Sequence, residues 1–222
     1  MTQVSTTTST LRQGVRAGLP LVAPTFALGA SFGVLAEPVM GAAAPIVMSL
    51  VVFAGGAQFA ALSVLAAGGV AGSAIAAGLL MNTRFLPMGF AVAPALSGPP
   101  IARAAQGQAL VDASFALANR GDGSFDRGVL LGATLPQLVA WTTGTVAGVV
   151  GGGLLGDPQA LGLDAIFPAF YALLLLEEIR GRRAAAAAVL GGAIVLALMP
   201  FAPAGVPVLA ATAAALIGLT RP

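Results

Sequence analysis

A series of apolar runs, each close to the length that crosses a bilayer, constrains what this chain can fold into. A helix needs about 20 apolar residues to cross the roughly 30 Å of hydrocarbon in a membrane. The runs lack the alternation of polar and apolar residues that the strands of a membrane barrel require, so they predict helices. Glycine, proline and charged residues mark the breaks between them. The predicted spans are residues 18–36, 41–66, 69–97, 128–150, 164–178, 184–199 and 205–219.

The scarcity of charged residues agrees with a chain that lies mostly in lipid. Hydrophobic residues make up 58% of the sequence and charged residues 8%, and the mean hydropathy is +0.96. About a quarter of a soluble domain is charged. Together with the apolar runs, this composition predicts an all-α, polytopic transmembrane helical bundle of about seven to eight helices, some of them short or broken.

The residue types that are missing exclude several functions. The chain contains no cysteine and no histidine, which removes thiolate nucleophiles and the commonest ligands of zinc. We therefore expect no enzymatic activity, no bound metal and no cofactor. A net charge of +2 is too small to predict a nucleic-acid partner. The partner that the composition predicts is the lipid bilayer.

The first residues differ in composition from the rest of the chain. Residues 1–15 are polar and rich in Ser and Thr, which is typical of a disordered tail. The breaks between the later apolar runs are short. Residues 16–222 are therefore predicted to form a single transmembrane transport domain.

Arginine positions predict how the chain is oriented, because short cytoplasmic loops carry more arginine than external loops. If the N-terminus with Arg12 and Arg16 lies inside, the loop at Glu37 lies outside. Two further spans, residues 41–66 and 69–97, would then bring the chain outside again near Gly98.

The following arginines require one more crossing. Arg120 and Arg127 should lie inside by the same rule, yet only residues 104–119 are available to return the chain from outside. This segment is short and carries Asp112, so it predicts a short or broken helix that is buried against its neighbours, with about eight crossings in total and both ends inside. The alternative is a bundle of about seven helices with residues 104–119 on the surface.

Glycines four residues apart recur in the apolar runs, as in the pairs Gly29 with Gly33 and Gly144 with Gly148. Small residues at this spacing share one helix face and allow two backbones to approach closely, so they predict tight helix packing. The alternative function of such contacts is to let helices slide during transport.

The second predicted span has an uncommon polar feature. Gly55 and Gly56 stand just before Gln58, and two glycines allow a helix to unwind and to expose carbonyl groups beside the amide. Gln58 can instead bond a neighbouring helix, and the sequence leaves both interpretations open.

Arg84 lies close to the middle of the third predicted span, where an uncompensated charge costs several kcal/mol. A guanidinium there can bind a carboxylate bidentately, with Asn82 two residues before it. Pro87 lacks an amide hydrogen, so the carbonyl of Thr83 is predicted to be free for another partner. In the alternative, the segment forms two half-length pieces and Arg84 reaches an interface.

Asp112 is a further polar candidate, and its interpretation depends on the topology. Within the membrane, its carboxylate could carry a proton, bind a substrate ammonium or pair with Arg84. In a loop, it would be an ordinary surface residue.

Several motifs make the chain resemble the AzlC family of branched-chain amino acid permeases, and the resemblance covers most of the chain. These motifs are GLP at 18–20, FG at 32–33, MS at 48–49, FAGGAQF at 53–59, NTR at 82–84, DASFAL at 112–117, WTTG at 141–144 and GLD at 162–164, leading to Phe170.

The resemblance implies a multi-pass exporter in the bacterial plasma membrane. Its expected substrates are small hydrophobic amino acids such as valine, leucine and isoleucine, its expected partner is a small AzlD-type membrane subunit, and its expected driving force is the proton gradient. One residue departs from the family pattern, since Ala113 stands where an acidic residue is expected after Asp112. Asp112 would then handle protons alone.

The expected site combines these residues. The substrate carboxylate would bind near Arg84 and Asn82, and its ammonium near Gln58, Asp112 or the carbonyls of Gly55 and Gly56. A different class of function is a membrane scaffold or assembly subunit without transport, in which Arg84 and Asp112 form a structural pair.

Overall fold

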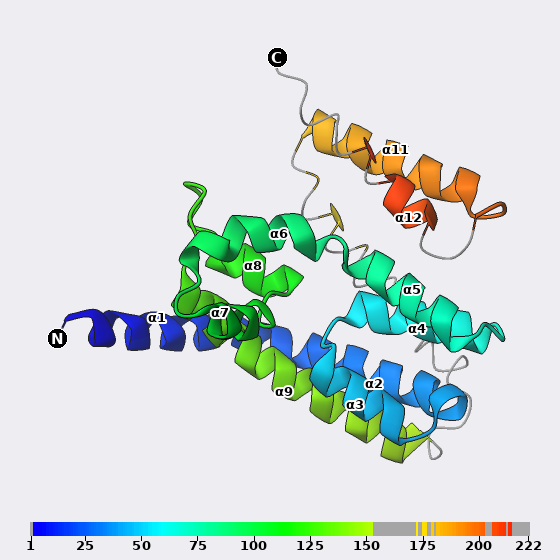
Figure 1. Cartoon of the computed structure of the whole chain (residues 1–222), viewed down its shortest axis with the longest axis horizontal. Helices are drawn as coiled ribbons and strands as arrows, with labels where there is room; N and C mark the ends of the chain where they lie inside the picture. The colour runs from blue at the N-terminus through cyan, green and yellow to red at the C-terminus, as the bar shows by residue number, and fades with distance from the viewer. Residues whose placement is uncertain are drawn as a thin grey trace. The chain divides into compact units, whose positions relative to one another are not determined.

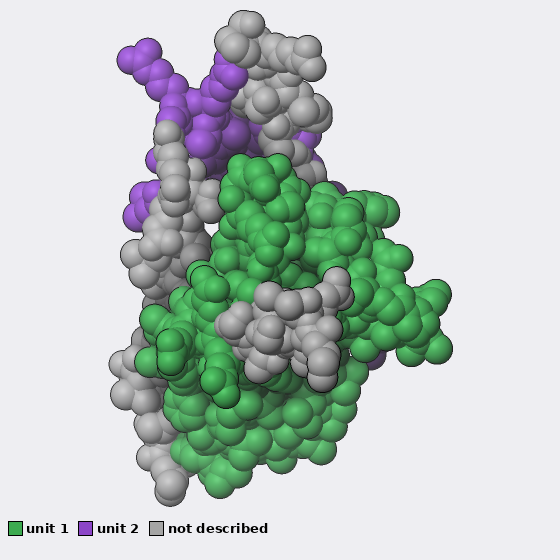
Figure 2. All heavy atoms as spheres, turned by 90° about the vertical axis from the view of Figure 1, so that its left-hand side faces the viewer, with its two compact units in different colours: residues 1–55, 83–156 green, residues 56–82, 157–222 purple. Residues whose placement is uncertain are grey.

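The structure, a computed structural model, describes residues 2–152, 181–202 and 206–211, together with 172, 175–176, 179 and 213–214. Every regular element in these residues is a helix, which confirms the predicted all-α class. The predicted span 164–178 lies largely outside the described residues, and the span 205–219 is described at 206–211 and 213–214. The chain divides into two compact units, residues 1–55 with 83–156 and residues 56–82 with 157–222 (Figure 2), while the prediction of a single transport domain stays a prediction.

The first unit is built on two long helices. One is formed by α1 (Thr2–Gly18), η1 (Leu19–Leu21) and α2 (Val22–Met40), and the other is α9 (Arg127–Gly151). Residues Thr10–Met40 and Arg127–Gly151 are the two described helices that are long and apolar enough to cross a membrane, and the bent pair Ala71–Asn82 and Phe85–Ala95 makes a third if it counts as one span. The predicted spans 18–36 and 128–150 are confirmed as helices.

Glycines bring these two helices into backbone contact along their length (Figure 1). A Cβ atom on any of four glycines of the first helix would lie less than 3.0 Å from a backbone oxygen of α9. This confirms the tight packing that the glycine spacing predicts. Residue numbers rise together along both helices, so the helices run parallel. The pairs are Gly14 with Val129, Gly18 with Ala133, Gly29 with Trp141, and Gly33 with Thr145.

Residues 2–15 belong to α1 in the structure, and the disordered tail that the composition predicts stays a prediction. Gly128 and Gly132 of α9 leave room for the helix, since a Cβ at these positions would collide with Thr10 and Leu11. The close packing on α9 therefore begins at Thr10.

The parallel packing gathers arginines at one end of the first unit. Because Thr10 lies beside Gly128, Arg12 and Arg16 lie at the same end as Arg127. We call this the arginine end, and Glu37 lies near the opposite end of the helix pair. The expectation that Arg12, Arg16 and Arg127 share one side therefore agrees with the structure, and its assignment to the cytoplasmic side by the arginine rule stays a prediction.

The predicted spans 41–66 and 69–97 are both broken. The first consists of α3 (Ala43–Val51) and α4 (Gly55–Ala66) with residues 52–54 between them. The second consists of α5 (Ala71–Asn82), α6 (Phe85–Val92) and η2 (Ala93–Ala95). Val92 packs against Ala118, Val129 and Leu130, so the chain reaches the arginine end by the close of α6.

Residues 98–119 form a hairpin that enters the first unit from the arginine end. Its helices are α7 (Pro100–Gly107) and α8 (Asp112–Ala118). The Nε of Arg127 donates to Gln106 Oε1 at 2.6 Å, and the amide of Asp126 donates to the carbonyl of Ala118 at 2.8 Å, so both arms lie beside the start of α9.

The expected crossing by residues 104–119 is therefore not made. The expectation assumed that the chain lies on the opposite side near Gly98, but Gln106 Nε2 donates to the carbonyl of Ser97 at 2.7 Å, which places Ser97 at the arginine end. Residues 41–97 have already carried the chain from the Glu37 end to this end. The part of the prediction that holds is a broken helix packed against its neighbours.

The second unit contains α4 and α5 together with α11 (Arg182–Leu198) and α12 (Val206–Ala211). α4 and α5 run antiparallel, since Gly78 near the end of α5 faces the carbonyl of Ala57 near the start of α4. α12 packs against α11 and contacts α5. The predicted span 184–199 corresponds to α11.

Candidate functional site

Two helix breaks meet in the first unit. The break after α3 covers residues 52–54, and the break at the tip of the hairpin covers residues 108–111. Gln108 joins them, because its Nε2 donates to the carbonyl of Val51 at 2.9 Å and to that of Val52 at 3.3 Å. Irregular backbone at membrane depth is tolerated where it lies against protein or lines a cavity, and such breaks form the binding sites of many transporters.

The α3 break is held in place by Trp141 of α9. The indole Nε1 donates to Ser49 Oγ at 3.1 Å, and Ser49 Oγ and Thr145 Oγ1 share a buried hydrogen bond of 2.8 Å. A Cβ at Gly55 would lie 2.8 Å from the indole ring. Phe53, directly before this contact, has a φ of 44°, a conformation that is costly for a residue with a bulky side chain.

The hairpin tip is fixed to α9 and to itself by hydroxyl groups. Thr134 Oγ1 donates to the carbonyl of Ala109 at 2.6 Å. The buried Ser114 accepts from the amide of Val111 at 3.0 Å and donates to the carbonyl of Ala109 at 2.8 Å. These bonds satisfy backbone groups that the break leaves without helical partners.

Arg84 and Asp112 form an ion pair beside the hairpin tip. Arg84 Nη2 lies 2.9 Å from Asp112 Oδ2, and the side chains are 29% and 40% exposed. The guanidinium also stacks over the ring of Phe85, with its Cζ 4.9 Å from the ring centroid. Neither side chain is fully buried among the described residues.

The ion pair lies well inside the length of α9. Asp112 directly follows the tip, whose Ala109 carbonyl is bonded to Thr134, and Thr134 lies about 10 Å along α9 from its start at 1.5 Å per residue. The arginine end and the Glu37 end hold the other described charges of the first unit. Arg84 and Asp112 thus lie between these two ends.

The structure tests the two backbone predictions at this site. The unwinding expected at Gly55 and Gly56 is wrong, because both glycines belong to α4 and the break precedes them. The role of Gly55 is steric, as it admits the Trp141 ring. The carbonyl of Thr83 is not left free by Pro87 but accepts the amide of Leu86 at 3.1 Å, since the chain forms a tight turn there.

The predicted site residues divide between the two units. Arg84 and Asp112 lie together in the first unit, which also contains Gly55. Gly56, Gln58 and Asn82 belong to the second unit. Gln58 is fully buried, and Asn82 Oδ1 is buried without a hydrogen-bond partner among the described residues.

Sequence reasoning missed Gln108 as a member of the site. The available signal was a second amide side chain in an apolar segment that also contains Asp112. Its partners were out of reach of the sequence, because Gln108 bonds residues more than fifty positions away.

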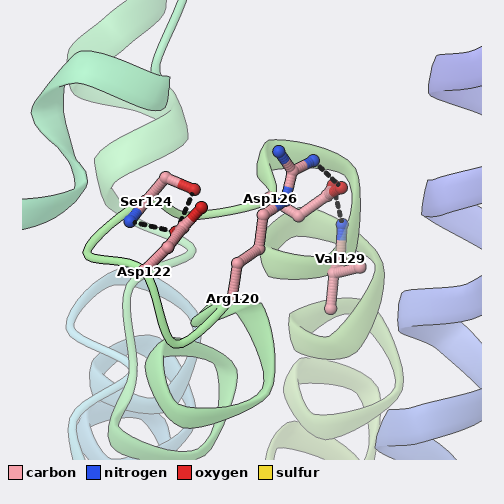
Figure 3. Close-up of polar contacts among 5 residues, drawn as sticks. All are labelled: Arg120, Asp122, Ser124, Asp126 and Val129. Carbon is pink, nitrogen blue, oxygen red and sulfur yellow. Dashed lines mark hydrogen bonds and ion pairs between the residues drawn. The ribbon is translucent and has the colours of Figure 1, made fainter.

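The arginine-end loop before α9 is a structural element (Figure 3). Arg120 Nη2 lies 2.6 Å from Asp126 Oδ2, and Asp126 Oδ1 accepts the amide of Val129 and so caps α9. Partial burial of Asp126 favours its neutral form, but the bonds from Arg120 and Val129 outweigh burial and lower its pKa. Hydrogen bonds from the hydroxyl and amide of Ser124 lower the pKa of Asp122.

Metal chemistry has no support in the described part of the chain. No group of three or more His, Cys, Asp or Glu residues there could hold a metal ion. The arrangement around Arg84 offers a cation, a carboxylate, backbone carbonyls and an amide. These groups suit a small zwitterion better than a reaction centre.

Comparison with known proteins gives one match. The AzlC family model, described as AzlC protein, matches residues 20–155. The matched segment covers more than half of the chain and contains Arg84, Gln108, Asp112 and Trp141. No curated protein and no solved structure matches the chain.

Proposed function

The chain belongs to the AzlC family, which is associated with branched-chain amino acid transport, and from this premise we propose that it exports branched-chain and other small hydrophobic amino acids. The apolar helices and the family make it a membrane protein. We place it in the bacterial plasma membrane and propose a small AzlD-type subunit as its partner.

The observation that carries this proposal is the ion pair of Arg84 and Asp112 beside two helix breaks. An arginine fork matches the geometry of a carboxylate, and a charged pair inside a membrane protein marks a substrate or ion pathway more often than a structural contact. In the proposed cycle the substrate carboxylate replaces that of Asp112 on Arg84. The substrate contacts predicted from the sequence for Gln58 and Asn82 stay predictions, and no contact is proposed for the carbonyls of Gly55 and Gly56, because both glycines are helical.

Proton coupling is assigned to Asp112. Export driven by an inward proton gradient requires proton and substrate to cross in opposite directions, so Asp112 carries a proton in the substrate-free return step of the proposed cycle and releases it before substrate binds. Because Ala113 follows it, no second carboxylate shares this proton. Asp112→Asn should therefore retain exchange of leucine between two pools and lose the dependence of net transport on the proton gradient.

The decisive experiment measures export of labelled valine and leucine from proteoliposomes that contain the chain with its small partner. Arg84→Ala should abolish transport without loss of membrane insertion. Arg103→Ala is the matched control, because Arg103 is exposed and donates to the carbonyl of Ala93 at 3.0 Å without touching the pair. Unchanged export by Arg84→Ala would contradict the proposal.

The ion pair also supports the second candidate, a scaffold or assembly subunit in which the pair is structural. The double variant Arg84→Asp with Asp112→Arg separates the two. It preserves the pair, so a scaffold keeps its assembly and its partner. A transporter loses transport, because the guanidinium has left the position where the substrate carboxylate binds.

A further inference from the structure

The carbonyl groups of Val51 and Val52 form a cation-binding position that the proposed function does not yet use. They lie at the C-terminal end of α3, where helix carbonyls carry partial negative charge. No backbone amide among the described residues donates to either carbonyl. Val51 is 66% exposed.

Gln108 occupies this position in the structure. Its amide NH₂ is a donor without positive charge, bonded at 2.9 Å and 3.3 Å, and its side chain is exposed. An ammonium carries three donors and a full charge, and would bind the same two carbonyls more strongly.

One hairpin tip therefore bonds both to a guanidinium, which can bind a carboxylate, and to backbone carbonyls, which can bind an ammonium. Gln108 presents N–H donors to the carbonyls of Val51 and Val52, and Asp112 presents a carboxylate to Arg84. These are the polar groups of a zwitterion, supplied by the chain itself. A substrate with both groups would compete with the hairpin tip for these contacts.

The other acidic residues of the first unit do not offer an alternative site for the ammonium. Glu37 lies near the end of α2. Asp122 and Asp126 lie in the arginine-end loop and bond Ser124 and Arg120. The carbonyls of Val51 and Val52 are bonded by the same hairpin tip that carries Asp112.

We propose that the carbonyl pair of Val51 and Val52 binds the ammonium of the transported amino acid, and that Gln108 holds this position until substrate displaces it. The inference rests on the proposed function and deepens it. Gln108 is then a residue that tunes affinity, and the hairpin tip must withdraw from α3 for the substrate to bind.

The test compares two ligands that differ in the ammonium alone, leucine and 4-methylpentanoate. Binding to the full chain with its partner in nanodiscs is measured for wild type, Gln108→Met and Gln108→Lys. Gln106→Met is the matched control, because Gln106 lies on the same hairpin but bonds Ser97 and Arg127. Thermal unfolding of each variant checks that the fold is intact.

Gln108→Met removes the competing donors and should lower the Kd for leucine by about 3- to 10-fold, the range of one hydrogen bond. Gln108→Lys supplies a tethered ammonium and should raise that Kd about 10-fold or more. The Kd for 4-methylpentanoate should stay unchanged in both variants. Gln106→Met should leave the ratio of the two Kd values as in wild type.

Equal shifts for both ligands, or leucine binding by Gln108→Lys that matches wild type, would overturn the ammonium site while leaving the transport function intact. Failure of wild type to bind or transport leucine would refute the proposed function itself, and the ammonium site with it.

Discussion

Replacing Gly18 by alanine tests the backbone contact between the first helix and α9. A Cβ at Gly18 would lie 2.6 Å from the carbonyl oxygen of Ala133, whereas ordinary contact begins at 3.4 Å. The side chain of Pro136, at 3.0 Å, can yield slightly, but a helical carbonyl cannot move without its helix. Forcing a methyl group into such a contact costs about 1–3 kcal/mol.

The matched control is Gly151→Ala at the end of α9, where an added Cβ meets nothing within 4 Å. Both substitutions gain up to about 1 kcal/mol of helix propensity, so the difference between them isolates the steric term. At about 2–4 °C per kcal/mol for a chain of this size, Gly18→Ala should unfold about 2–12 °C below Gly151→Ala. The assay is thermal unfolding in detergent, and equal midpoints would refute the close packing.

Two further predictions concern the arginine end. Single cysteines can be placed in the cysteine-free chain and labelled with an impermeant thiol reagent. The reagent should modify Ser97→Cys and Ser124→Cys from one side of the membrane and Ala43→Cys from the other. Modification of Ser97→Cys and Ala43→Cys from the same side would contradict the hairpin. The lowered pKa of Asp126 means that its bonds stabilise the fold above the ordinary carboxyl pKa and are lost as pH falls through the lowered value. In Asp126→Asn, the unfolding temperature should therefore fall less steeply with pH below pH 3.8 than in wild type. An unchanged pH profile would show that the pair with Arg120 does not contribute to stability.

The sequence predicted the helical class and the close packing because both depend on local patterns. Apolar runs of fixed length report lipid exposure, and Gly29 with Gly33 reports a helix face that lacks side chains. The partner of that face is not a local property. Only the structure shows that Gly29 and Gly33 contact Trp141 and Thr145, and that the two helices run parallel.

The topology between these helices was predicted only in part, for a reason that concerns breaks. Counting spans assumes that each apolar run crosses once, but residues 41–66 and 69–97 are both interrupted, and together they move the chain from one end to the other. Arg127 correctly indicated that residues before α9 return to the arginine end. It could not show that Ser97 was already there.

The pairing of Arg84 with Asp112 was among the interpretations that the sequence allowed, whereas the backbone around the pair was not predicted. Arg84 and Asp112 were found because isolated charges in apolar runs need partners. Gln108 was missed because an amide gives no such signal, and the breaks at Phe53 and Val111 depend on packing against Trp141 and Thr134. Gly55 lies next to the first break, but its role there depends on its small size and not on its flexibility.

The contacts also distinguish the part of the first unit that can move from the part that cannot. Sliding of the first helix along α9 would push backbone carbonyls against glycine Cα atoms at Gly14, Gly18, Gly29 and Gly33 together, and close-packed contacts of this kind do not deform continuously. The hairpin tip is bonded to α9 through Thr134, to the end of α3 through Gln108 and to Arg84 through Asp112, and the last two bonds are worth about 1 kcal/mol each. A substrate that offers the same groups can replace both at little net cost. The glycine spacing allowed two interpretations, tight packing and helix sliding. The structure favours tight packing without sliding, and the contacts that a substrate can replace lie on the hairpin.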